Sequence, residues 1–201
     1  YIAAAASVLL FAAVCLRFVP GWMRFWTPGG YIDKPRAESA GRGILPRIYV
    51  SLLGFCAGMF ALIYVIYLAC GYRADLRSFL DFWTLTDSGH YLDIARDWYL
   101  SEGSVDRLVQ LVFLPGYPLA VRLVHLAVRD WVAAGLLVSW LSFAGAGCVL
   151  YRLLRLDYSH AQSLRALRFL CLIPGSFFFV SPMSESLFLL LSLGCVYMAR
   201  R

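Results

Sequence analysis

The sequence predicts an all-α membrane protein: a polytopic bundle of transmembrane helices with an external loop that carries an amphipathic helix. Hydrophobic residues make up 61% of the 201 residues, more than in an average soluble domain. Residues 48–70 and 132–151 are apolar runs without a charge, and each is long enough to cross a hydrocarbon core about 30 Å thick. Residues 1–16 and, apart from Glu185, residues 169–199 are apolar as well.

These runs divide a single membrane domain, residues 1–201, into four parts. Residues 1–47 contain a first span and a basic connector, and residues 48–70 form the next span. Residues 71–111 form the external loop, and residues 112–201 supply further membrane segments. The chain begins with Tyr and stops directly after an apolar run, so we expect it to be part of a longer protein. Its first residues lack the basic start and cleavage pattern of a signal peptide.

The distribution of charge predicts which loops face the cytoplasm. The stretch 17–47 has six basic residues against two acidic ones, whereas the stretch 71–107 has seven acidic residues against four arginines. Because cytoplasmic loops are enriched in Lys and Arg, the first stretch should be cytoplasmic and the second external, in a multi-pass protein of the cell membrane. The net charge of +6 lies in such flanking loops and does not indicate nucleic-acid binding.

The segment 112–128 allows two topologies. It contains two prolines, Arg122 and His125, which is unusual for a helix that faces lipid. If it crosses the membrane, the arginine-rich stretch 152–168 falls outside, against the charge rule. If it dips in without crossing or packs against other helices, that stretch is cytoplasmic and the turn 181–186 is external. We favour the second arrangement, because irregular backbone is tolerated where protein surrounds it.

The external loop contains the residues most suited to chemistry. Apolar and aromatic residues recur with helical spacing from Tyr91 to Tyr99, so an amphipathic helix of about three turns should lie on the membrane surface. Asp87 directly precedes this helix. It is either a catalytic carboxylate near the lipid headgroups or a helix cap, a role that Asp often fills. Asp81 and Asp93 lie in the same loop and are alternative bases.

Each of the other candidates also has a structural interpretation. His90 is either a donor to a phosphate or sugar hydroxyl, or an ordinary interfacial imidazole. Arg122 is either a phosphate ligand or a side chain that reaches from an apolar segment to the interface. Glu185 must lie in a loop or face a polar cavity, and Ser184 could cap the following helix.

Two features concern rigidity and metal binding. Pro115 and Tyr117 belong to a turn, Phe-Leu-Pro-Gly-Tyr-Pro from residue 113, whose simplest role is to end a helix. The carboxylates of the external loop leave room for a divalent cation, but no spacing demands one. The six cysteines form no Cys-x-x-Cys pair, so neither a disulfide framework nor a zinc site is indicated. No cofactor is otherwise expected.

Three motifs occur in a characteristic order: Asp-Ser-Gly-His-Tyr-Leu-Asp-Ile-Ala from Asp87, Phe-Leu-Pro-Gly-Tyr-Pro-Leu from Phe113, and Ile-Pro-Gly-Ser-Phe-Phe-Phe-Val-Ser-Pro-Met-Ser-Glu-Ser-Leu-Phe from Ile173. Together they resemble the PIG-V-like GPI mannosyltransferases, which belong to the GT-C superfamily of integral membrane glycosyltransferases. The resemblance covers residues 79–201 and matches the N-terminal part of the family. Thr86 stands where the family usually has Trp. The chain has 17 Arg against one Lys, which suggests a bacterial member.

The resemblance implies a GT-C-like bundle that transfers mannose, or a similar hexose, with inversion from a polyprenyl-phosphate sugar to a lipid or glycan acceptor. The transfer would take place at the extracytoplasmic face. Asp87 would act as general base or orient the acceptor hydroxyl. A cation would stabilise the departing phosphate, with Arg122 the first candidate and Arg96 the next. The other residues expected to bind substrate are His90, Tyr91, Pro115, Tyr117, Ser184 and Glu185.

Two functions without transferase activity are alternatives. A transporter or lipid-handling protein would use Asp87, Glu185 and Arg122 to bind a polar headgroup or a proton, and would form no glycosidic bond. An accessory subunit would use its charges for assembly, so Asp87→Asn would leave the activity of the complex intact. The three motifs in order favour the enzyme.

Overall fold

The computed structural model describes Ala13, Leu16 and residues 43–100 and 110–201. The chain divides into two units, Tyr1–Ala37 and Glu38–Arg201. Every helix with assigned bounds belongs to the second unit, and the residues that the structure describes contain no strand. The all-α class is confirmed for this part of the chain. Apart from Ala13 and Leu16, the predicted first span 1–16 lies outside the described residues, as does most of the basic connector.

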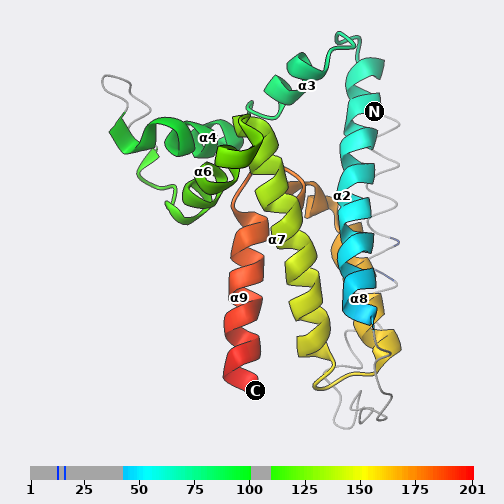
Figure 1. Cartoon of the computed structure of the whole chain (residues 1–201). Coiled ribbons are helices and arrows are strands. Elements are labelled where there is room, and N and C mark those ends of the chain that lie inside the picture. The colour runs from blue at the N-terminus through cyan, green and yellow to red at the C-terminus, as the bar shows by residue number, and fades with distance from the viewer. Residues whose placement is uncertain (1–12, 14–15, 17–42, 101–109) are drawn as a thin grey trace. The chain divides into compact units, whose positions relative to one another are not determined.

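The second unit is built from helices of very different lengths, and its long helices run between two ends (Figure 1). In chain order its elements are α2 (Ile44–Ala69), α3 (Leu76–Phe82), α4 (Asp87–Asp97), η1 (Trp98–Leu100), α6 (Gly116–Val128), α7 (Trp131–Leu154), α8 (His160–Leu172), η2 (Pro174–Phe179) and α9 (Glu185–Arg200). We call the end with α3, α4 and α6 the acidic end. The basic end holds the start of α2, the end of α7, the start of α8 and the end of α9.

The two long helices match the predicted spans 48–70 and 132–151. Both α2 and α7 are long and apolar enough to cross a membrane, judged by length and composition. The two helices differ in how far protein covers them. Of the most apolar 18 residues of each helix, 17% are buried in α2 and 61% in α7. The helix α7 is therefore the central one, and α2, α6, α8 and α9 all pack against it.

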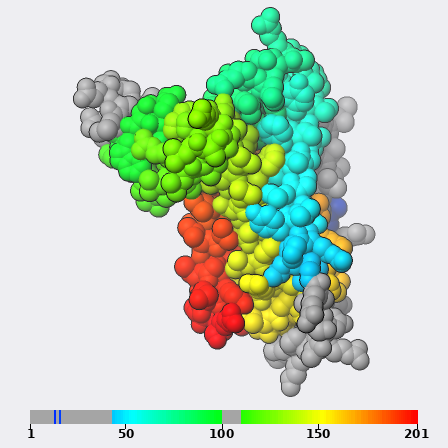
Figure 2. Space-filling view, in the orientation of Figure 1, coloured from blue at the N-terminus to red at the C-terminus, as the bar shows by residue number. Residues whose placement is uncertain are grey.

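The segment 112–128 does not run the length of the bundle. Its helix α6 has 13 residues, about 20 Å at 1.5 Å per residue, which is shorter than a hydrocarbon core. It packs against α4 and α7, and the two short helices project together beside the N-terminal part of α7 (Figure 2). The stretch 152–168 meets the end of α9 at the basic end, where Arg200 pairs with Asp157 at 2.6 Å. The packing of 112–128 against other helices is therefore confirmed, and the cytoplasmic side of the stretch 152–168 stays a prediction.

The apolar stretch 169–199 is not one continuous span. The helix α8 ends at Leu172 and α9 begins at Glu185, so the chain turns back part of the way along α7. Val180 and the first half of the turn 181–186, Ser181 to Met183, are buried within the protein; that this turn faces the extracytoplasmic side stays a prediction. Irregular backbone can be buried only when its polar groups are paired. Here Ser139 donates to the carbonyl of Met183 at 3.2 Å, and Trp140 Nε1 donates to that of Val180 at 3.0 Å.

The amphipathic helix is present as α4, with a different role for its apolar face. It ends at Asp97 instead of Tyr99 because Trp98 has a positive φ of 59° with ψ −158°, a backbone conformation that does not continue the helix. Leu92, Ile94 and Ala95 are buried, and α4 packs against α6 and α7. The apolar face therefore contacts protein, although the sequence led us to expect that it would lie on the membrane.

Gly135 in α7 permits the close approach of the buried turn and of α4. A Cβ atom at this position would lie 2.7 Å from Pro182 Cβ, 3.1 Å from Leu92 Cδ2 and 3.4 Å from the Tyr117 hydroxyl. The proline ring is rigid and fully buried, so it cannot move aside. Any side chain at this position must push the turn away from α7.

We expect Gly135→Ala to lower the free energy of unfolding by about 1–3 kcal/mol through overpacking. The matched control is Gly54→Ala in α2, where a Cβ would meet nothing within 4 Å; the higher helix propensity of Ala should leave stability equal or raise it by up to about 1 kcal/mol. The measurement is the thermal unfolding midpoint of the purified protein in detergent. Equal shifts for the two variants would contradict this packing.

Candidate functional site

Asp87 is the first residue of α4 and its carboxylate is free. The N-cap position belongs to Thr86, so the interpretation of Asp87 as the helix cap was wrong. The helix dipole favours an acidic residue in the first turn, so a negative charge at Asp87 is compatible with the start of α4. The side chain is exposed and forms no hydrogen bond or ion pair with the residues that the structure describes. It is therefore available to a ligand.

Tyr91 links α4 to the residue that precedes α9. It lies one helical turn after Asp87, and its hydroxyl is 2.7 Å from Ser184 Oγ. Ser184 occupies the N-cap position of α9 but makes no side-chain capping bond, so its hydroxyl serves this cross-link instead. Burial raises the pKa of Tyr91; the bond from Ser184 opposes this, while the charges of Glu185 and Asp87 add to it. Tyr91, Ser184, Asp87 and Glu185 thus belong to one site.

Glu185 is a half-buried carboxylic acid with an unusual environment. Its Oε2 atom is buried and has no hydrogen-bond partner in the described part of the chain. Burial raises the pKa of this carboxyl, and the nearby charge of Asp87 raises it further. Removing an ionised carboxylate from water without a partner is costly, so burial favours the protonated form. The site therefore holds two interacting carboxyl groups, one exposed and one half-buried.

Tyr117 lies in the protein interior, where it supports Tyr91 of the site. It was expected to bind substrate, but its side chain is only 2% exposed. Its hydroxyl bonds to the carbonyl of Gly135 at 2.9 Å and to Ser139 Oγ at 3.0 Å. Its ring meets that of Tyr91 edge-on at 5.3 Å. Tyr117 therefore positions Tyr91 and has no surface left for a ligand.

The motif residues around Phe113 occupy the flank of the site. Phe113 contacts Tyr91 edge-on at 4.8 Å and lies 5.2 Å from the ring of His90. The turn therefore packs on the first two turns of α4, as expected if it shapes the same site. Pro115 is exposed and occupies the N-cap position of α6. His90 is half-buried and makes no hydrogen bond with the described residues.

The two candidate cations lie at the other end of α4. Arg122 donates to the carbonyl of Arg96 at 3.0 Å, and its guanidinium lies 5.6 Å from the centre of the Trp98 ring. Arg96 pairs with Asp93 and Asp97 at 2.9 Å each. Arg96 follows Asp87 by nine positions, which is about 14 Å along a helix axis. The structure therefore does not bring Arg122 or Arg96 to the two carboxyl groups.

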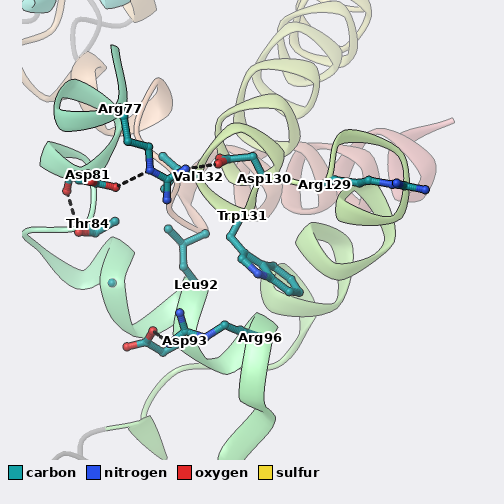
Figure 3. A pocket seen from close by; sticks show the side chains of 11 residues that line it. Arg77, Asp81, Thr84, Leu92, Asp93, Arg96, Arg129, Asp130, Trp131 and Val132 are labelled. Carbon is teal, nitrogen blue, oxygen red and sulfur yellow. Dashed lines mark hydrogen bonds and ion pairs between the residues drawn. The ribbon is translucent and has the colours of Figure 1, made fainter. Parts of the chain in front are cut away.

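A polar cavity of about 440 Å³ lies on another face of α4, between α3 and the start of α7 (Figure 3). Asp81 and Asp93, the alternative bases, are among its lining residues, and both are in ion pairs. Arg77 bridges Asp130 at 2.6 Å and Asp81 at 3.4 Å. Sequence analysis missed Arg77 and Asp130, because a pair 53 residues apart leaves no local pattern. Asp87, Tyr91 and Glu185 do not line this cavity.

The site offers no preformed metal centre. Among the described residues, no three His, Cys, Asp or Glu side chains come close enough to hold an ion. Two carboxyl groups beside a tyrosine and a serine hydroxyl provide acceptors and donors for hydroxyl-rich ligands, and one group able to take up a proton.

In comparisons with known proteins, no family model, no curated protein and no solved structure matches this chain. The resemblance stated in the sequence analysis therefore rests on its three motifs alone.

The Tyr91–Ser184 hydrogen bond should contribute about 0.5–1.5 kcal/mol to stability. We expect Tyr91→Phe and Ser184→Ala each to lower the unfolding midpoint, and the double variant to lower it by less than the sum of the two. A double-mutant cycle on the purified protein measures this coupling. Strictly additive effects would show that the two hydroxyls do not act together.

The raised pKa of Glu185 should make stability depend on pH. Because the folded protein holds this proton more tightly than the unfolded chain, folding is favoured at low pH, and that contribution is lost as the pH rises from the ordinary value of 4.5 through the raised pKa. Glu185→Gln cannot ionise and should be more stable than the wild type at neutral pH. Unfolding midpoints of both proteins between pH 4 and 8 would show a difference that widens with pH. A constant difference would argue against a raised pKa.

Proposed function

We propose that this protein is a multi-pass membrane glycosyltransferase that moves mannose, or a similar hexose, from a polyprenyl-phosphate sugar to a lipid or glycan acceptor. The reaction would take place at the extracytoplasmic face of the cell membrane. One observation carries the proposal: Asp87 and Glu185, 98 residues apart, form one site beside the N-terminal part of an apolar helix. This site contains residues from all three motifs that resemble the PIG-V-like family.

Asp87 has the properties that a general base needs. Its carboxylate is exposed and engaged by no described side chain, so it is ready to accept a proton. In the proposed reaction the acceptor hydroxyl attacks the anomeric carbon from the face opposite the phosphate, and its proton passes to Asp87. The bond between the anomeric carbon and the phosphate oxygen breaks with inversion, and the lipid phosphate leaves as an anion.

Glu185 would complement Asp87 as a donor. Because burial raises the pKa of the Glu185 carboxyl, this group suits a role in which it keeps its proton. In its protonated form Glu185 would donate a hydrogen bond to a sugar hydroxyl while Asp87 accepts one. Tyr91 and Ser184 would fix the distance between the two, because they join α4 to the start of α9.

The cation that stabilises the departing phosphate is not assigned. No arginine in the described ranges 43–100 and 110–201 forms an ion pair with Asp87 or Glu185. Arg122 is held against Trp98 and the Arg96 carbonyl, a position better suited to fastening α6 to α4.

The test supplies a radiolabelled polyprenyl-phosphate mannose to membranes that contain the full-length protein. The wild type should transfer label to an endogenous acceptor, and Asp87→Asn should lower the rate by about 10²–10⁴-fold, the usual contribution of a general base. Asp97→Asn is the control: Asp97 lies on the same helix and is also exposed, and the variant should keep most of the activity. Protein levels and retention in alkali-washed membranes are compared for all variants.

The outcomes separate the alternatives. Equal transfer by wild type and Asp87→Asn would remove Asp87 from catalysis, and Asp81→Asn and Asp93→Asn would then identify the base. No transfer by the wild type, from either a mannose or a glucose donor, would contradict the enzyme. Release of the protein by alkali would contradict its place in the membrane.

A further inference from the structure

A second site lies at the basic end, between α2 and α8. The first three turns of α2 and the later turns of α8 line a groove of about 540 Å³, within the range of small-molecule sites. Most of its lining side chains are apolar. The polar ones are Arg47, Ser51 and Arg168.

The floor of the groove is created by a glycine in α7. The side chain of Leu52 fills the space that a Cβ on Gly147 would occupy, and Leu167 approaches the same point to 3.6 Å. Both leucines are nearly fully buried. Leu52 and Leu167 pack against α7 at the bottom of the groove. Side chains farther from α7, including Phe55 of α2 and Leu172 of α8, line its two sides.

The polar groups gather on one part of this apolar surface. Arg47 and Ser51 are four residues apart and therefore lie on the same face of α2. Arg168 stands across from them on α8, and Cys171 and Leu172 follow it one turn later. Neither arginine forms an ion pair or side-chain hydrogen bond with the described residues. The groove therefore combines two guanidinium groups without a counter-ion, one hydroxyl and an apolar surface. This combination favours a ligand with an anionic head and an apolar tail.

The residues around the groove are mostly basic, like Arg47 and Arg168 within it. Asp157 is the single acidic residue among residues 43–47, 152–168, 200 and 201, and it is already paired with Arg200. The arginines in these stretches are Arg47, Arg152, Arg155, Arg165, Arg168, Arg200 and Arg201. Basic pockets between membrane helices on the cytoplasmic side bind anionic lipid headgroups.

We propose that the groove between α2 and α8 binds an anionic phospholipid. Its phosphate lies between Arg47 and Arg168, the Ser51 hydroxyl donates to a phosphate oxygen, and an acyl chain follows Phe55 and Leu172. This inference rests on the membrane location proposed above but not on the transferase activity. The two sites lie at opposite ends of the bundle.

Lipid binding is measured on the full-length protein purified in mild detergent, with phosphatidylglycerol and phosphatidylcholine of matched chains as probes. Native mass spectrometry gives the affinities. The wild type should prefer phosphatidylglycerol, and Arg47→Gln with Arg168→Gln should weaken its binding about thirtyfold, since each arginine near an anionic lipid is worth about fivefold. The matched control, Arg152→Gln with Arg165→Gln, removes two exposed arginines from the same end outside the groove and should retain more than half of the preference.

A photo-cross-linker at Leu172, which is 76% exposed, identifies what lies in the groove. We expect an adduct with phosphatidylglycerol. An adduct with residues 1–42 of the same chain, or with a second copy, would overturn the proposal. Equal binding of the two lipids by the wild type, or equal loss in both double variants, would also overturn it. Helicity measured by circular dichroism verifies that the variants fold.

Discussion

The small side chains on α7 allow the rest of the second unit to pack. Gly135, Ser139 and Gly147 lie along this helix, and each meets a different neighbour: Pro182 of the buried turn, Tyr117 of α6 and Leu52 of α2. Without a bulky side chain at these points, backbones approach closely enough for dispersion contacts and hydrogen bonds to form across the helices. In a bilayer such contacts matter more than apolar burial, because lipid is as apolar as a leucine side chain.

The buried turn before α9 follows from this packing and creates the site. Once α8 stops at Leu172, the chain must turn back within the bundle, and its carbonyls need donors there. Ser139 and Trp140 supply them from α7. The same turn delivers Ser184 to Tyr91 and leaves Glu185 half-buried near Asp87. The unpaired Oε2 atom of Glu185 is therefore a consequence of the fold, and unpaired buried polar atoms are uncommon enough to suggest a ligand.

The two ends of the unit differ in how their charges are used. At the acidic end most charges are paired with one another, as Arg77 is with Asp130 and Arg96 is with Asp93, so Asp87 stands out as a free carboxylate. At the basic end Arg200 is paired with Asp157, whereas Arg47 and Arg168 form no ion pair with the described residues and border an apolar groove. The polar site around Asp87 and the apolar groove with its two arginines lie at opposite ends, so the protein is suited to binding two different molecules at once.

The sequence by itself determined the elements that depend on local composition and periodicity. The long apolar runs predicted α2 and α7, the helical spacing after Asp87 predicted α4, and the charge balance of the loops predicted which ends lie together. The tertiary structure alone decided the burial of the turn 180–183, the enclosed position of Tyr117 and the placement of Arg122 on Trp98. These features depend on contacts between residues far apart in the chain, and the helical period of a segment does not say which partner its face will meet. The end of α8 shows the same limit. The proline that follows α8 predicts that the helix ends there, but only the packing on α7 decides how deeply the turn before α9 is buried.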